Sequence, residues 1–366
     1  MDILNNIQLI IFIIGLTQGL IFSILLIYLD QRKNRPTLLL GLFIFAYSIN
    51  YIEPISALLK LDENYPFLNN LPLDFSWLLF ALFYVYIRNL SLLPKSNKIY
   101  IYLVPGMVIL IMNMLVYLKV SSYIEKLRFS EVFRFVHHIG GHLYAIFIYY
   151  QTHKFISKHT LEINNQYAST TGRELKWAKY FMLTGVLFTL TNHFTSKLHN
   201  IYLDLTEAII NVGLLYWISI YGIRQQTIKN LIQQKSFVIE KNDKLHKKNE
   251  ISEEDKDLFN RVQQIFISQK VYKNPDLAIV DIANIINEHP KKISTIINEV
   301  SNKNFKTFVN GFRINEAKEI LKSSSSDYYS IEGIILEVGF KSKSAFYDAF
   351  RKETGTTPIN YQNKSS

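Results

Sequence analysis

Two short polar stretches in the last quarter of the chain carry side chains suited to recognising nucleic acid. The first holds Lys291, Lys292, Ser294, Thr295 and Asn298, and the second holds Lys343, Ser344, Tyr347 and Asp348. Lysine can contact guanine or a phosphate, asparagine can pair with adenine, and serine or threonine can contact a base edge or a phosphate. These residue types predict contacts with double-stranded DNA, provided that each stretch is presented as one exposed face.

The apolar residues around the first stretch predict two helices joined by a short turn. Residues 282–286 form the first helix, residues 287–289 the turn, and Pro290 opens the second helix, with Ile293 and Ile297 facing inward. Proline suits a first helical position, because the amide that it lacks would have no partner there. The pattern predicts a helix-turn-helix motif whose second helix presents the polar stretch to a major groove.

The second stretch has the same layout. Residues 331–338 form a helix, the turn covers 339–341, and a second helix buries Phe346 and Phe350. Gly339 supplies the backbone freedom that a tight turn demands. A predicted amphipathic helix of about 18 residues separates the two motifs and would be about 27 Å long. This length is comparable to the roughly 34 Å between successive major grooves on one face of DNA, so one chain could read two adjacent grooves.

Residues 277–361 resemble the DNA-binding domain of the AraC/XylS family of bacterial transcription regulators. The resemblance rests on residues 313–321 between the motifs, on 331–340 and 344–352 in the second motif, and on 355–358 with Tyr361. It implies an all-helical domain in which Lys291, Ser294 and Thr295, and then Lys343, Ser344, Tyr347 and Asp348, read bases.

Four positions depart from the family pattern. Ile335 replaces a usual Ala, and Asn302 stands where Gly is typical, although Asn tolerates left-handed geometry. Ala278 replaces a usual helix-capping Thr or Ser, which costs about 1 kcal/mol. Asp348 is repelled by phosphate unless its carboxylate accepts from a cytosine amino group, so the first motif is better suited to base reading.

The first 223 residues have a different composition and are rich in apolar and aromatic residues. A helix needs about 20 apolar residues to cross the hydrocarbon of a bilayer. Seven segments qualify as expected transmembrane helices, the last three least clearly: 7–29, 37–59, 72–90, 99–119, 133–153, 177–197 and 203–223. The first has no basic residue before it and is too long for a cleavable signal, so we expect it to be retained.

Charge predicts the orientation of these helices, because short cytoplasmic loops are enriched in Lys and Arg. With the N-terminus outside, the inner loops carry Arg32, Lys33, Arg35, Arg88, Lys95, Lys98, Lys154, Lys158, Arg173, Lys176 and Lys179. An odd number of spans delivers the C-terminal domain to the cytoplasm. We therefore expect a multi-pass protein of the bacterial inner membrane.

Several ionisable residues fall inside these expected spans, where they are costly and are functional candidates by default. The candidate sensing pocket comprises Glu53, Asp74, His138, His142, His193 and Glu207, with His137 beside it. All fall toward the outer leaflet in the expected topology. They either pair across helices as structural contacts, or bind a ligand or protons, or hold a metal, and the first interpretation is favoured. No metal is assigned.

Residues 224–257 form a polar connector between the transmembrane sensor domain of 1–223 and the DNA-binding domain of 258–366. Ile228, Leu231, Ile232, Lys235 and Ile239 keep helical spacing, so the last span either continues into a dimerising helix or gives way to a solvated tether. A homodimer is the expected assembly.

Composition narrows the function further. The net charge of +10 and the pI of about 9.3 favour anionic partners such as DNA or a membrane face. The chain has no cysteine, which excludes disulfides and thiolate chemistry, and it carries no phosphate-loop or kinase motif. We expect no enzyme and no cofactor, but a membrane-bound regulator that responds to an unknown signal ligand. The alternative is a transporter or receptor whose helical tail binds proteins.

Overall fold

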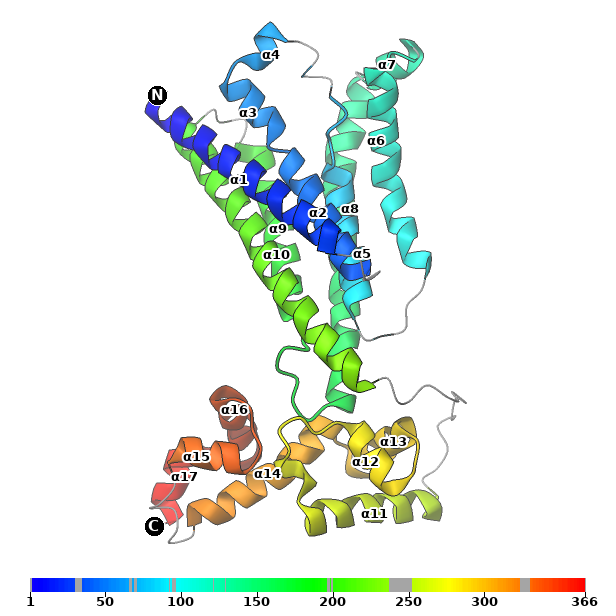
Figure 1. The fold of residues 1–366 in the computed structure, drawn as a ribbon, viewed down its shortest axis with the longest axis vertical. Helices are drawn as coiled ribbons and strands as arrows, with labels where there is room; N and C mark the ends of the chain where they lie inside the picture. Colours follow the sequence, from blue (N-terminus) through cyan, green and yellow to red (C-terminus); the bar gives the residue numbers. More distant parts are fainter. Residues whose placement is uncertain are drawn as a thin grey trace. The chain divides into compact units, whose positions relative to one another are not determined.

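A computed structural model describes residues 2–29, 35–65, 68, 71–91, 93, 97–120, 122–128, 130–195, 198, 200–236, 252–322 and 330–365 (Figure 1). The chain divides into two compact units, Met1–His159 with Leu175–Val238, and Thr160–Glu174 with Ile239–Ser366. Across the described residues all regular elements are helices, apart from one isolated β-bridge. The predicted all-helical class is therefore confirmed.

The first unit is built from long helices. They are α1 (Asp2–Leu29), α2 (Arg35–Ile49), α3 (Ile52–Leu58), α4 (Leu61–Asn64), α5 (Ser76–Leu90), η3 (Asn97–Leu103), α6 (Val104–Tyr117), α7 (Ser122–Arg128), α8 (Glu131–Gln166), α9 (Lys176–Thr195) and α10 (Ile201–Ser236). The helix α1 packs on α2 and α10, α2 packs on α5, and α9 packs on α10. Their shared core is aromatic, with Phe43, Phe83 and Phe181 in mutual contact.

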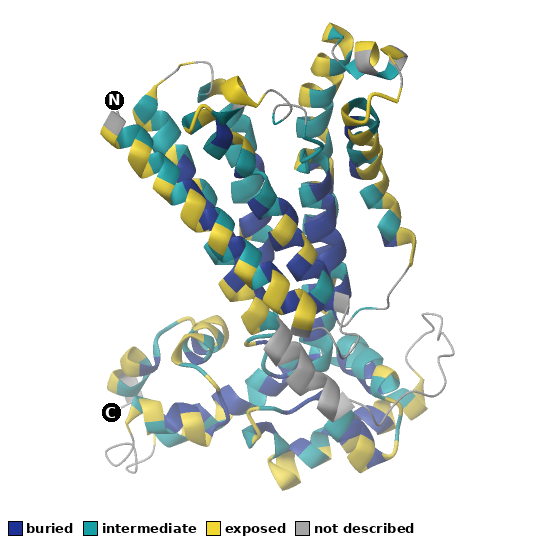
Figure 2. Cartoon of the chain, turned by 45° about the horizontal axis from the view of Figure 1, so that its top comes forward, coloured by how far each residue is buried: buried dark blue, intermediate teal, exposed yellow. Residues whose placement is uncertain are grey.

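Helix α1 shows how small residues allow these helices to approach one another. Its buried positions recur every three or four residues and include Gly15, Gly19 and Ser23. A Cβ atom at Gly19 would lie 1.8 Å from the hydroxyl of Ser48 on α2. In Figure 2 this N-terminal helix carries buried residues on one side and exposed residues on the other. Close packing through small residues is typical of helices in membranes.

Four helices in the described part of the chain are long and apolar enough to cross a bilayer: Ile3–Tyr28, Pro36–Leu58, Asn97–Tyr117 and Ile201–Gln225. They correspond to the first, second, fourth and seventh expected spans. The helix at the third, Ser76–Leu90, is apolar but shorter. The expected count of seven transmembrane helices is not confirmed. The helices α8 and α9, at the positions of the fifth and sixth expected spans, do not meet the combined requirement of length and hydropathy.

The helix of the last expected span, α10, extends beyond residue 223 and ends at Ser236. The first part of the predicted connector is therefore helical, and its pairing with a second copy stays a prediction. Ile239 and the basic residues Lys241, Lys244, Lys247 and Lys248 lie outside the described residues.

The second unit contains the predicted motifs. Its helices are α11 (Glu253–Gln269), η4 (Val271–Lys273), α12 (Ile279–Ile286), α13 (Pro290–Ser301), α14 (Phe305–Lys322), α15 (Ile331–Glu337), α16 (Lys343–Thr354) and α17 (Pro358–Ser365). One hydrophobic cluster joins α11, α12, α13 and the start of α14, and a second joins the rest of α14 to α15 and α16. Both predicted helix pairs and the 18-residue helix between them are confirmed.

Candidate nucleic-acid interface

The first motif consists of α12 and α13, which meet across a left-handed turn at Asn287, with φ of 60°. Ile282, Ile286, Ile293 and Ile297 are buried between them. Ala278 has no side-chain acceptor for the first amides of α12, as the sequence indicated. The carboxylate of Asp281 partly compensates by accepting from the Ala278 backbone N–H at 2.9 Å.

The second motif consists of α15 and α16, and both helices are capped by serine. The hydroxyl of Ser330 accepts from the amide of Gly333 at 3.1 Å, and that of Ser342 accepts from the amide of Ala345 at 3.3 Å. Phe346 and Phe350 are fully buried, as predicted. Gly339 in the turn has φ of 89°, a left-handed geometry that confirms the predicted need for glycine.

The structure distributes the predicted DNA-contacting residues unevenly. On α13, Lys291 is exposed, whereas Lys292, Ser294, Thr295 and Asn298 are half-buried. On α16, Lys343, Ser344 and Asp348 are exposed and Tyr347 is half-buried. Their contacts with DNA stay a prediction.

Two of the predicted lysines are paired with carboxylates. Lys292 Nζ lies 3.0 Å from Glu254 of α11 and 3.8 Å from Glu288, and the hydrogen bond to Glu254 raises the pKa of the lysine. Lys343 Nζ lies 2.7 Å from Glu332 of α15, a pair that raises the pKa of the lysine and lowers that of the glutamate. Exposed pairs of this kind are weak, so phosphate groups can compete for these lysines.

A buried arginine fastens the helix between the motifs. Arg313 on α14 is 1% exposed, and it donates from Nε to the carbonyl of Tyr272 at 2.7 Å and from Nη2 to that of Asn274 at 2.8 Å. Its guanidinium also lies 5.3 Å from the ring centre of Phe340, beside the turn of the second motif. Burial lowers the pKa of Arg313 to about 10, which leaves it charged at neutral pH.

A surface cluster continues this connection. Glu316 on α14 accepts from the Tyr272 hydroxyl and lies 3.0 Å from Lys273 and 3.1 Å from Lys270. Burial acts to raise the pKa of Glu316, but these hydrogen bonds outweigh it and hold the pKa below its usual value. Lys273 also pairs with Glu337 of α15 at 2.6 Å. The segment 270–274 thus joins α14 to α15 of the second motif.

The structure brings together part of the predicted sensing pocket in the first unit. Asp74 lies 2.9 Å from His137 Nε2 on α8. The rings of His138 and His142 are centred 6.1 Å and 5.3 Å from that of His193 on α9. Glu207 accepts from Asn192 at 2.6 Å and from Thr195, while Glu53 is exposed. Within the described ranges, no group of three such side chains could hold a metal ion.

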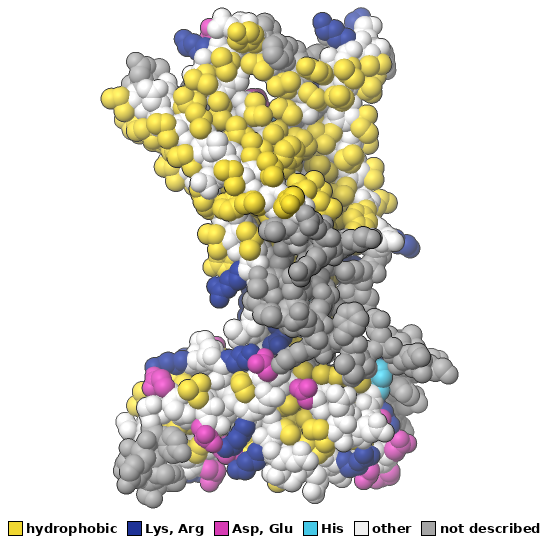
Figure 3. Space-filling model, in the orientation of Figure 1, with side chains coloured by type: hydrophobic (Ala, Val, Ile, Leu, Met, Phe, Trp, Pro, Cys, Tyr) yellow, Lys and Arg dark blue, Asp and Glu magenta, His cyan; other side chains and the backbone are white. Residues whose placement is uncertain are grey.

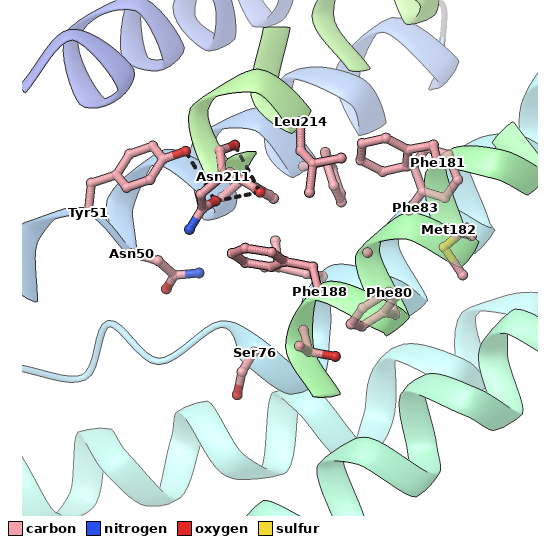
Figure 4. Close-up of a pocket in the computed structure, with 15 residues that line it drawn as sticks. Asn50, Tyr51, Ser76, Phe80, Phe83, Phe181, Met182, Phe188, Asn211 and Leu214 are labelled. Carbon is pink, nitrogen blue, oxygen red and sulfur yellow. Dashed lines mark hydrogen bonds between the residues drawn. The ribbon is translucent and has the colours of Figure 1, made fainter. Parts of the chain in front are cut away.

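A cavity of about 210 Å³ in the first unit was not anticipated from the sequence, where the aromatic residues were interpreted as packing and interfacial anchors. Its walls are Phe43, Tyr47, Asn50, Tyr51, Ser76, Leu79, Phe80, Phe83, Phe181, Met182, Gly185, Phe188, Thr189, Asn211 and Leu214. Figure 4 shows Asn50 and Asn211 toward one end, with Phe80 and Phe181 toward the other. The signal that sequence reasoning missed was asparagine within two apolar segments, Asn50 directly after α2 and Asn211 on α10.

The polar end of the cavity is organised by Asn211 on α10. Its side-chain oxygen accepts from the hydroxyls of Tyr47 at 2.5 Å and Tyr51 at 3.3 Å. In the part of the chain that the structure describes, neither the Asn211 nor the Asn50 amide nitrogen donates a hydrogen bond. The cavity can therefore offer amide donors at one end and aromatic surface at the other.

Comparison with known proteins locates a family match in the second unit. Residues 282–364 match the family described as a helix-turn-helix domain. The chain is 30% identical over 122 residues to the melibiose operon regulatory proteins of Escherichia coli K12 and of E. coli O6:H1 strain CFT073. The match covers 32% of this chain and 39% of each relative, so the chain spans about two fifths of their length.

One solved structure is similar over the same share of the chain. The C-terminal domain of AraT, a response regulator from Geobacillus stearothermophilus, is 22% identical, and the match covers 32% of this chain and 88% of that domain with a TM-score of 0.26. The family match and the two helix pairs agree on residues 282–364. Residues 282–364 are therefore a helix-turn-helix domain of the AraC type.

Proposed function

We propose that the chain is a membrane-bound, sequence-specific transcription regulator, which acts without enzymatic activity and changes its occupancy of DNA when a signal reaches its first unit. The observation that carries the proposal is that the same chain contains an AraC-type helix-turn-helix domain and four helices long and apolar enough to cross a bilayer. The melibiose regulator is, by its name, the regulator of an operon. The alternative, a transporter or receptor with a protein-binding tail, lacks such support.

The surface of the first unit supports a lipid environment. Ile10, Ile24, Val108 and Leu187 are each more than half exposed, on the three helices α1, α6 and α9. Figure 3 shows the visible face of this unit covered by hydrophobic side chains, with most of its charged ones near the ends. Soluble monomers rarely expose apolar surface so extensively. We propose that the protein crosses the bacterial inner membrane seven times, with its N-terminus outside and its DNA-binding domain in the cytoplasm. We also propose that it forms a homodimer.

The expected result for DNA binding is a steep dependence on salt. The full chain in lipid nanodiscs should enrich specific duplexes from a random pool, and affinity should fall with a log–log slope of about −0.9 for each phosphate contacted. Lys291→Ala should weaken binding about 5- to 100-fold, since a good base contact contributes about 1–3 kcal/mol. Lys256→Ala, at an exposed position of α11, serves as the control and should change the affinity for DNA much less. Failure to enrich any duplex would favour the protein-binding alternative.

We assign the signal ligand to the aromatic cavity, as a small neutral molecule with an apolar body and one hydrogen-bond acceptor. The walls carry no charged side chain, and the amide nitrogens of Asn50 and Asn211 are available to an acceptor. Pockets of this composition bind such molecules. The sensing role of Glu53, Asp74, His138, His142, His193 and Glu207 stays a prediction, and insensitivity to external pH and to replacement of the three histidines would contradict it.

Acetophenone and ethylbenzene form a matched pair of probes for the cavity, because they differ mainly by one carbonyl. Acetophenone should raise the thermal unfolding midpoint of the detergent-solubilised chain more than ethylbenzene does, since binding to the native state alone stabilises it. The double variant Asn50→Leu with Asn211→Leu should abolish the difference, because it removes both amide donors. Equal shifts from both probes in the parent chain would contradict the assigned polar end.

A further inference from the structure

Residues Thr160–Glu174, which comprise the end of α8 and the connection to α9, belong to the second unit together with the DNA-binding domain. In the sequence this segment falls within the basic loop between the fifth and sixth expected spans. It contains the last residues of α8, which ends at Gln166, and the connection to α9, which begins at Lys176. A segment from within the first half of the chain is therefore part of the folded C-terminal domain.

The backbone and one apolar side chain join the segment to the first motif. The Ala168 amide donates to the carbonyl of Leu277 at 3.0 Å, and Tyr167 forms an antiparallel bridge with Ala278 at the start of α12. Ala168 is 2% exposed and belongs to the hydrophobic cluster that contains Ile282 and Ile293. The docked segment thus completes part of the core of the motif.

Polar contacts hold the remainder of the segment. Lys306 at the start of α14 donates to the Thr170 hydroxyl at 2.9 Å. Arg173 lies 3.6 Å from Asp276 and 4.3 Å from the ring centre of Tyr167. Lys341 in the turn of the second motif contacts the same Asp276 oxygen at 2.5 Å. The segment is therefore held at several independent points.

Its other contact falls on the face of α13 that the sequence assigns to DNA. Ser294 donates to the Asn165 carbonyl and Asn298 donates to the Asn165 side-chain oxygen, both at 3.4 Å. Because Ser294 and Asn298 are four residues apart, they share one helix face. A major groove about 12 Å wide admits one helix and leaves no space for a second chain segment over its reading face. The segment and DNA would therefore compete for the same surface.

We propose that Thr160–Glu174 is an intramolecular lid on the first helix-turn-helix motif, and that this motif binds DNA only after the lid is released. The proposal rests on the proposed function. The apparent affinity for DNA is then proportional to the fraction of molecules in which the lid is released. The lid continues directly into α9, whose Phe181, Met182 and Gly185 line the aromatic cavity, so the two are linked by a short length of chain.

A disulfide tests the lid in the full chain, which has no cysteine of its own. The bridge between Tyr167 and Ala278 is a non-hydrogen-bonded pair, in which Cα atoms are about 4.5 Å apart, within disulfide reach. The double variant Tyr167→Cys with Ala278→Cys should cross-link on oxidation and lose binding to the duplexes enriched by its reduced form. Reduction should restore binding. Failure to cross-link, or equal binding in both forms, would overturn the proposal.

A substitution that releases the lid should have the opposite effect to the disulfide and raise the affinity for DNA. Ala168→Arg places a charge at a buried site and should expel the lid, raising affinity for the enriched duplexes about tenfold or more. Thr171→Arg adds the same charge at an exposed position of the same segment and should change affinity much less. Equal affinity of the Ala168 variant and the parent contradicts the lid. If neither variant nor parent enriches any duplex, the proposed function itself fails.

Discussion

Replacing Arg313 with Ala should increase the hydrogen-exchange rates of the α14 and α15 amides about 100- to 1,000-fold. This is the effect of lowering the free energy of unfolding of this region by about 3–4 kcal/mol. Arg313 is almost fully buried and donates to two backbone carbonyls in the segment that follows α11. The variant leaves these acceptors without their donors and opens a cavity. Each hydrogen bond from a charged group contributes about 1.5–3 kcal/mol, and the cavity adds to the loss.

Arg313→Lys is the matched control for this effect. Lysine keeps the charge and most of the apolar stem, but its ammonium is a point donor and cannot reproduce the fixed fork of the guanidinium. We expect an intermediate rise in exchange, and a loss of the contact with Phe340 that orients the second motif. If both variants exchange like the parent chain, α14 is held by its apolar face alone and the buried arginine is not needed.

Most of the second unit could be predicted from the sequence, because its signals are local. Pro290 starts α13 and Gly339 is in the turn before α16, as their backbone preferences require. The apolar spacing of Phe346 and Phe350 placed them in the core, where both are fully buried. Asn302, expected to tolerate left-handed geometry, has φ of 52°.

The features that could not be predicted depend on contacts between distant segments. Arg313 is the first residue of the family pattern at 313–321, and nothing in its neighbours indicates that Tyr272 and Asn274 offer it carbonyls. Ala168 occurs in a polar stretch, and its burial depends on a cluster of residues between Leu258 and Val309, far later in the chain. The cavity likewise combines α2, α5, α9 and α10, which hydropathy identified one at a time.

The transmembrane count shows a third kind of limit. Hydropathy identifies helices that face lipid, but α8 and α9 also carry polar and ionisable residues that make contacts within the first unit. His137 on α8 pairs with Asp74, and Asn192 on α9 donates to Glu207. Such residues lower mean hydropathy without excluding a position inside a helical bundle. Composition alone therefore cannot separate a polar span from a helix outside the membrane.

Gly339→Ala should destabilise the second motif by about 2–4 kcal/mol, because it combines backbone strain with a collision. Gly339 has φ of 89°, and a Cβ atom there would lie 2.5 Å from the carbonyl oxygen of Lys273 and 2.8 Å from that of Tyr272. Both obstacles are backbone atoms, so no side-chain rotation relieves them. The expected result is a rise of about 30- to 1,000-fold in hydrogen exchange of the α15 and α16 amides.

Two other glycines separate the causes of this loss. Gly355 after α16 has φ of 74° but open space around its Cβ position, so Gly355→Ala should cost only the strain, about 1–2 kcal/mol. Gly311 within α14 has neither obstacle, and Gly311→Ala should be neutral or stabilising by up to about 1 kcal/mol. Among the three alanine variants, the one at Gly311 is therefore predicted to be the most stable, the one at Gly355 less stable and the one at Gly339 the least stable. If the Gly339 and Gly355 variants lose equal stability, the close approach of segment 270–274 to the turn contributes nothing, and the second motif is fixed in place by Arg313 and the glutamate pairs instead.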